Sequence, residues 1–140
     1  YVSGHWPTFS TLVRTHPNAK RVSIAVSVHA DARVLDVERG DATPDQAPAW
    51  VKRQHEVIHT KRPGVYTFLA QAQTLVDDLA KAGIPRDQYV LWTAHWTGVP
   101  HICDSRCGNG FHDKADATQY TNHVGTRNAD ESLCTPEFFE

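Results

Sequence analysis

The chain has 140 residues, of which 40% are hydrophobic and 21% are charged, and its net charge is −2. This composition suits one globular domain with a buried core and excludes a disordered chain. The charge gives no basic surface for nucleic acid, and no apolar run is long enough to span a membrane. We therefore expect a single domain over residues 1–140 that neither binds nucleic acid nor crosses a bilayer.

Strands and helices are expected to alternate from the N-terminus. Segment 1–6, YVSGHW, is a candidate strand, and a short helix is expected at about 8–16. Segments 21–28 and 33–38 are rich in Val and Ile and are bounded by polar residues, which predicts two strands. A longer helix is expected over 44–59, because it begins with a favourable capping residue and a proline.

The same alternation continues in the second half of the chain. Segment 62–69 contains the next strand, and 71–83 has apolar residues at helical spacing before a terminal glycine. Further strands are expected at 89–96 and 116–121. The segment between them, 97–114, is rich in Gly, Cys and His and is predicted to be a loop.

Alternating strands and helices are typical of parallel βαβ units. Five or six strands fit two architectures, an open doubly wound sheet and an incomplete α/β barrel. In both architectures the functional site lies at the carboxyl ends of the strands. Candidate functional residues are therefore sought where each strand ends.

Two acidic residues end the strand predicted at 33–38. Asp36 and Glu38 are two positions apart, so they share one face of the strand. Burying neighbouring carboxylates is costly and would raise the pKa of at least one of them. A carboxyl group that stays protonated near neutral pH can protonate a glycosidic oxygen, while an ionised neighbour stabilises an oxocarbenium-like transition state. The alternative interpretation is that both acids merely end the strand.

Five segments in a fixed order resemble one enzyme family. They are LDVERGDATPDQAPAWV, GVYTF, LWTAHWTG, ATQYT and NADES. Their order over about residues 20–134 is similar to that of glycoside hydrolase family 25 muramidases. It is more similar still to the glycoside-hydrolase-like domains of actinobacterial secreted proteins and of phage lysins. The resemblance implies an irregular TIM-barrel-like (β/α) fold, and the chain is short enough for one strand of that barrel to be missing or shortened.

The resemblance also implies a function and a set of site residues. It implies an N-acetylmuramidase-like (lysozyme-like) hydrolase that cleaves β-1,4 glycosidic bonds of peptidoglycan with no cofactor and no metal. It makes Glu38 the proton donor and Asp36 its assisting carboxylate, and it adds a third acid, Asp130. The residues expected to bind glycan are Tyr66, Trp96, Gln119 and Tyr120. Because Gln119 and Tyr120 are adjacent on a strand, only one of them can line the site.

The resemblance further implies a protein that is secreted or released by a phage and acts at the bacterial cell wall, as a monomer or as one domain of a larger protein. The family usually has another aspartate on its first strand, where this chain has only Ser3 or His5 near the equivalent place. A second hypothesis follows from that difference. The chain could be a non-catalytic cell-wall glycan-binding domain on the same fold.

A third hypothesis comes from segment 55–59, HEVIH, which has the H-E-x-x-H spacing of zinc metallopeptidases. On the expected helix, Glu56 should point to solvent, away from the apolar stripe. That stripe comprises Ala47, Trp50, Val51, Gln54, Val57 and Ile58. The further ligand of one metallopeptidase class is also missing, since Arg62 and Val65 stand where Gly and His would be needed. We therefore rank the zinc peptidase below both glycan hypotheses.

The loop at 97–114 concentrates cysteine and histidine. Residues with plausible spacing for a structural zinc site are His101, Cys103, Cys107 and His112, with Cys134 as a further candidate. A disulfide, either Cys103–Cys107 or one of these with Cys134, is the favoured alternative, and free thiols are the third. The loop follows Trp96, so it is expected to overhang the site.

Overall fold

The computed structural model describes residues 1–5 and 7–140. Its mixed α/β fold contains a sheet in which six strands follow one another in chain order. The strands are β1 (Ile24–Ala25), β2 (Val34–Asp36), β3 (Gly64–Phe68), β4 (Val90–Ala94), β5 (Ala117–Thr121) and β6 (Glu131–Cys134). β1 to β5 are parallel, and β6 runs antiparallel to β5.

The helices are α1 (Phe9–Thr15), α2 (Ala47–Val57) and α3 (Leu69–Lys81). α2 is preceded by a 3₁₀ turn, η1 (Pro44–Gln46). The Thr43 amide donates to the Gln46 side chain at 3.0 Å, and this hydrogen bond satisfies one of the free N–H groups at the start of the helix. α3 buries the apolar side that its spacing predicts, namely Leu69, Ala72, Leu75, Val76 and Leu79. α1 buries none of its side chains.

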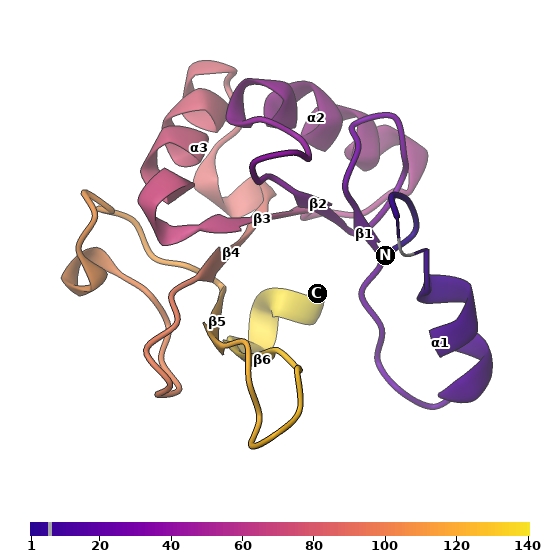
Figure 1. The fold of residues 1–140 in the computed structure, drawn as a ribbon. Coiled ribbons are helices and arrows are strands. Elements are labelled where there is room, and N and C mark those ends of the chain that lie inside the picture. The colour runs from indigo at the N-terminus through magenta and orange to yellow at the C-terminus, as the bar shows by residue number, and fades with distance from the viewer. Residues whose placement is uncertain (6) are drawn as a thin grey trace.

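The sheet curves into an arc with one covered face (Figure 1). α2 and α3 lie on the outer side of the arc, and the C-terminal turn η4 (Pro136–Phe139) lies on the inner side. The strand order does not reverse, so the doubly wound alternative is wrong. β1 and β6 are the two edges of the described sheet, which is open between them.

The two faces of the sheet have different roles. The outer face contributes Leu35, Val65 and Leu91 to the main apolar core under the two helices. The inner face carries a row of side chains that the strand register places side by side: Asp36, Tyr66, Trp92, Ala117 and Cys134. The inner face is therefore where acidic and aromatic side chains can meet.

Several predicted boundaries differ from the structure. The strand expected at 21–28 is reduced to two residues, and the helix expected over 44–59 ends at Val57. Residues 1–5 contain no strand, and residue 6 of that candidate strand lies outside the described residues. The antiparallel strand β6 was not predicted. No helix among the described residues is both long and apolar enough to cross a membrane.

Candidate active site

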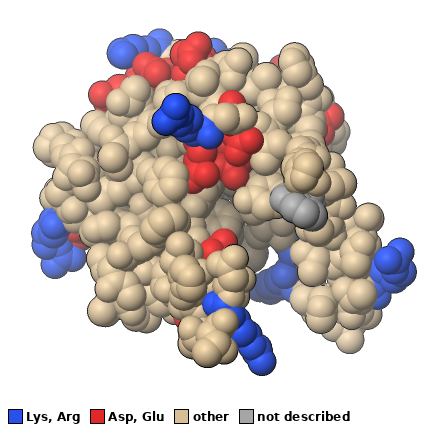
Figure 2. All heavy atoms as spheres, in the orientation of Figure 1, with Lys and Arg blue, Asp and Glu red and all other residues tan. Residues whose placement is uncertain are grey.

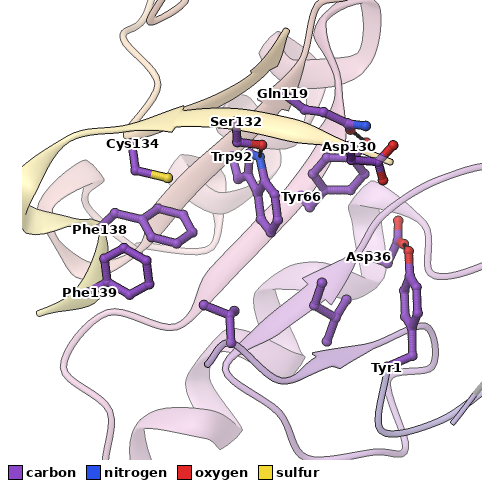
Figure 3. A pocket seen from close by; sticks show the side chains of 12 residues that line it. Tyr1, Asp36, Tyr66, Trp92, Gln119, Asp130, Ser132, Cys134, Phe138 and Phe139 are labelled. Carbon is purple, nitrogen blue, oxygen red and sulfur yellow. Dashed lines mark hydrogen bonds between the residues drawn. The ribbon is translucent and has the colours of Figure 1, made fainter. Parts of the chain in front are cut away.

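A cavity of about 280 Å³ lies on the inner face of the arc. Each of the six strands contributes to its wall, and η4 closes it from the C-terminal side (Figure 3). The lining side chains from strands are Ile24, Asp36, Tyr66, Trp92, Gln119, Ser132 and Cys134. The curvature of the sheet thus brings side chains from distant parts of the chain around one space.

The cavity has an apolar end and a polar end. At the apolar end, the Trp92 ring packs edge-on against Phe138, with ring centroids 5.6 Å apart. At the polar end, Figure 3 shows the carboxyl groups of Asp36 and Asp130, with the Tyr1 hydroxyl beside Asp36. Figure 2 shows acidic side chains gathered beside a central hollow on this face of the molecule. A ligand with an apolar side and polar groups would suit such a cavity.

Asp36 at the polar end belongs to a cluster of carboxyl groups without a cation, whose other members, Glu38 and Asp41, do not line the cavity themselves. One carboxyl oxygen from each of Asp36, Glu38 and Asp41 lies within 4.8 Å of the others. Within the described chain, no lysine or arginine forms an ion pair with any of the three. One buried oxygen of Asp36 and one of Glu38 also have no hydrogen-bond partner there. Such unpaired buried acids are costly, which favours a functional reason for their presence.

The environment favours the protonated form of this pair. Burial raises the pKa of Asp36 to about 7, and the charges of Glu38 and Asp41 act in the same direction. The Tyr1 hydroxyl donates to Asp36 Oδ2 at 3.3 Å and opposes this rise. Burial also raises the pKa of Glu38, as do the charges of Asp41 and Asp130, while the Tyr66 hydroxyl lowers it. Asp36 therefore retains its proton up to about neutral pH, and the surroundings of Glu38 favour its protonated form as well.

Replacing Asp36 by Asn is expected to stabilise the fold in alkaline but not in acidic solution. The pKa of Asp36 rises from 3.8 to about 7 on folding, so the wild type loses stability as pH increases through that interval. Asparagine cannot ionise and still accepts a hydrogen bond from Tyr1. Denaturant unfolding at pH 8 should show a gain of about 2–4 kcal/mol that disappears at pH 4. A gain independent of pH would contradict the proposed cost of ionisation.

Two of the predicted glycan-binding residues meet inside the cavity. The Tyr66 hydroxyl donates to Gln119 Oε1. The Tyr66 ring lies edge-on to Trp92 with centroids 5.1 Å apart, and Trp92 Nε1 donates to Ser132 Oγ at 3.1 Å. These contacts fix the orientation of the inner wall. The role of Tyr66 and Gln119 in binding glycan stays a prediction.

The other two predicted glycan-binding residues lie outside the cavity. Trp96 is 50% exposed, and its ring packs edge-on against Phe68 with centroids 5.5 Å apart, beyond the ends of β3 and β4. The Tyr120 hydroxyl donates to Glu131 at 2.8 Å instead of facing the cavity. Of the adjacent pair Gln119 and Tyr120, only Gln119 lines this space.

Some residues in or near the site were not identified from the sequence. Phe68 follows Tyr66 by two positions on β3, so the strand alternation that placed Tyr66 could have identified it. Tyr1 and Phe138 reach the cavity from the two ends of the chain, and no local pattern indicates that.

The H-E-x-x-H segment does not form the geometry of a zinc peptidase. α2 ends at Val57, and His59 has a positive φ of 51° beyond the helix, so the two imidazoles are not one helical turn apart. His55 Nδ1 is 3.0 Å from the Thr60 carbonyl oxygen, and Glu56 is exposed, as expected. Val57 and Ile58 are exposed as well, so the predicted apolar stripe is wrong at its C-terminal end.

The cysteine-rich loop does not form the disulfide that the sequence analysis favoured. All three cysteines are free thiols, so the expected disulfide is absent from the described chain. Cys134 lines the apolar end of the cavity beside Phe138 (Figure 3), and His112 is exposed on the surface. The groups that instead lie close together are His95, His101, Cys103 and Cys107.

No family model, curated protein or solved structure matches this chain.

Proposed function

We propose that this chain is a peptidoglycan-cleaving glycosidase of the N-acetylmuramidase type, with an irregular TIM-barrel-like (β/α) fold. The bacterial cell wall is its proposed place of action, reached by secretion or by release from a phage. One observation carries the proposal. An acid pair without a cation, Asp36 and Glu38, lies at the carboxyl end of β2, beside a cavity with aromatic walls.

Glu38 is the proposed general acid. Asp36 is only 2% exposed and is held by Tyr1, whereas the longer Glu38 side chain lies nearer the surface. In the proposed reactive state, Glu38 carries a proton and Asp36 is ionised, so the proton that the raised pKa of Asp36 favours there has to pass to Glu38 before the bond breaks. Glu38 donates that proton to the glycosidic oxygen as the bond to the sugar carbon breaks. The Asp36 carboxylate stabilises the positive charge that develops on the sugar or orients its acetamido group. Water then adds to the sugar carbon and its proton returns to Glu38, which completes the hydrolysis.

The aromatic residues provide the proposed glycan-binding surface. The volume of the cavity is at the low end for ligand pockets, so it would accept a ring-sized part of a glycan rather than a long segment. The rest of the glycan chain would extend over Phe68 and Trp96, which are both exposed at the carboxyl ends of β3 and β4. Sugar rings present apolar C–H faces that pack against flat aromatic rings.

Replacing either Phe68 or Trp96 by Ala should weaken glycan binding by about 5- to 10-fold, because each change removes roughly 1 kcal/mol of aromatic contact. Titration calorimetry with a soluble peptidoglycan oligomer measures this loss. KM should rise more than kcat falls, since a ring that packs on the sugar contributes equally to binding in the ground state and in the transition state. The Tyr120→Phe variant is the control, because the Tyr120 hydroxyl donates to Glu131 and Tyr120 does not line the cavity. Unchanged binding by both alanine variants would show that Phe68 and Trp96 do not belong to the glycan-binding surface.

A non-catalytic glycan-binding domain is the second candidate. It is favoured by the N-terminal segment, where Tyr1 contacts Asp36 and Ser3 Oγ accepts from the Val26 amide at 3.2 Å, with no carboxylate in residues 1–5. On this alternative, the same surface would bind glycan, and the acid pair would only accept hydrogen bonds from it.

Incubation of the purified chain with bacterial cell walls separates the two candidates. We expect new reducing ends, which mass spectrometry should identify as N-acetylmuramic acid. Co-sedimentation with the walls measures binding in parallel. Binding without new reducing ends would support the glycan-binding domain. Absence of both binding and cleavage on walls of several chemotypes would refute both candidates.

A further inference from the structure

Four metal-ligating side chains meet beside the end of β4. His95 directly follows that strand, His101 and Cys103 lie on the long loop, and Cys107 ends the 3₁₀ turn η3 (Ser105–Cys107). One ligand atom from each of the four lies within 4.8 Å of all the others. Cys103 is buried, and the other three are partly buried.

The distances among these atoms match those around a tetrahedral zinc ion. Cys103 Sγ is 3.4 Å from His95 Nδ1 and 3.5 Å from His101 Nε2, and the two nitrogens are 3.0 Å apart. With zinc bonded to nitrogen at about 2.0–2.1 Å and to sulfur at about 2.3 Å, tetrahedral angles separate N from S by roughly 3.6 Å and N from N by roughly 3.3 Å. The three observed distances lie close to these values.

The orientation of His101 favours a metal over a purely hydrogen-bonded cluster. Its Nδ1 is 2.8 Å from the Val99 carbonyl oxygen, which can only accept, so Nδ1 carries the proton of the neutral ring. The lone pair of Nε2 is then directed at His95 and Cys103. Zinc-bound histidines commonly use their second nitrogen in this way, because the backbone contact fixes both tautomer and ring orientation.

We propose that His95, His101, Cys103 and Cys107 bind one Zn²⁺ ion in a structural site. Two thiolates and two imidazoles are a common donor set for structural zinc, and they fill all four positions, leaving none for a reacting water. This inference departs from the sequence-based expectations of no metal and of a disulfide. It also replaces His112 and Cys134 in the earlier ligand set with His95.

The proposed ion would attach the long loop to the sheet near the glycan surface. Cys103 is already positioned by its amide, which donates to Thr118 Oγ1 of β5 at 2.8 Å. His95 immediately precedes Trp96, so a bound ion would also fix the backbone that carries this ring. A surface depression lined by His95, His101 and Cys107 gives the ion a path from solvent. The zinc proposal does not depend on the proposed glycosidase activity.

Metal content of the purified full chain tests the proposal. Mass spectrometry of the metal should find one zinc ion per chain after incubation with zinc and removal of the excess. The Cys103→Ser and Cys107→Ser variants should lose it. Cys134→Ser and His112→Gln are matched controls that should retain it, because neither side chain belongs to the cluster. Equal loss of zinc from the controls would overturn the assignment.

Cobalt binding to the metal-free wild type tests the same site without relying on the folding of the variants. Co²⁺ should produce the strong visible absorption of tetrahedral coordination together with a thiolate-to-metal charge-transfer band, and zinc should abolish both. A weak octahedral spectrum would overturn the proposal. So would an intact mass two hydrogens lower than that of the reduced chain, which would show that a disulfide forms instead.

Discussion

Replacing Glu38 by Gln is expected to lower the rate of glycan hydrolysis by about 10²- to 10⁴-fold, the usual contribution of a positioned general acid. Glutamine keeps the shape of the side chain but has no proton to donate to the glycosidic oxygen. The fold should be unaffected or slightly stabilised, because the change removes a partly buried acid that repels Asp41 and Asp130. Counting reducing ends released from cell walls measures the loss, and thermal unfolding checks the fold.

Glu56→Gln is the matched control for this experiment. It makes the same chemical change on the exposed side of α2, within the H-E-x-x-H segment, and should leave the rate unchanged. If Glu38→Gln is as active as the wild type, the proposed mechanism fails. If Glu56→Gln is the inactive variant, the zinc peptidase hypothesis returns.

Aryl glycosides distinguish the roles of the two site acids. A nitrophenyl leaving group is a weak base and departs without protonation, so a nitrophenyl glycoside should restore much of the rate of the Glu38→Gln variant. It should not restore the rate of Asp36→Asn, because the charge on the sugar still needs the ionised carboxylate. The reverse result would make Asp36 the proton donor, in keeping with its strongly raised pKa.

The elements that were predicted well are those with a strong local pattern. α3 repeats its apolar residues at helical spacing, and β3 and β4 are short apolar runs buried under it. β6 was missed because its side chains alternate only between exposed and half-buried at the edge of the sheet, so its composition is not that of a buried strand. β1 is short for a related reason, since only two of its residues pair with β2.

The candidate site was predictable only where strand ends determine it. Asp36 and Glu38 could be identified because strand alternation places two acids together after an apolar stretch. Tyr1 reaches Asp36 across 35 positions of the chain, and a contact at that separation leaves no local pattern. His95 was likewise missed, because its approach to Cys103 depends on the path of the loop and not on the spacing of its cysteines.

A second acidic cluster lies at the opposite end of the sheet and is fully paired. Asp116 precedes β5 and is 12% exposed as a side chain. Its carboxylate accepts from Arg62 at 2.7 Å, from Arg86 at 2.6 Å and from the Leu91 amide at 2.8 Å. Burial alone would raise the pKa of Asp116, but the Leu91 amide and the two guanidinium groups outweigh it and lower that pKa. The amino ends of β3, β4 and β5 are thus joined by one ion-pair network.

Replacing Asp116 by Asn should destabilise the fold by about 3 kcal/mol, the lower end of the cost of breaking a buried ion pair. The variant turns one acceptor oxygen into an NH₂ donor that faces a guanidinium group. Each arginine keeps a carbonyl partner at Tyr89, which limits the loss. Urea unfolding at pH 7 measures the difference. Asp113→Asn is the matched control and should cost less than about 1 kcal/mol. Its Oδ1 accepts from Arg86 at 3.3 Å and from the Lys114 amide at 2.6 Å, and an asparagine Oδ1 can keep both contacts.

The pH dependence of this destabilisation separates the two acid clusters. Because folding lowers the pKa of Asp116, its ion pairs contribute fully above about pH 4 and are lost as pH falls through the lower pKa of the folded state. The difference between wild type and Asp116→Asn should therefore persist from pH 5 to 8 and shrink below pH 4. Asp36→Asn should behave in the opposite way, with its stabilisation growing as pH rises toward 8. If both variants destabilised the protein at pH 8, the acids at the carboxyl end of the sheet would serve the fold, and their burial would no longer indicate a catalytic role.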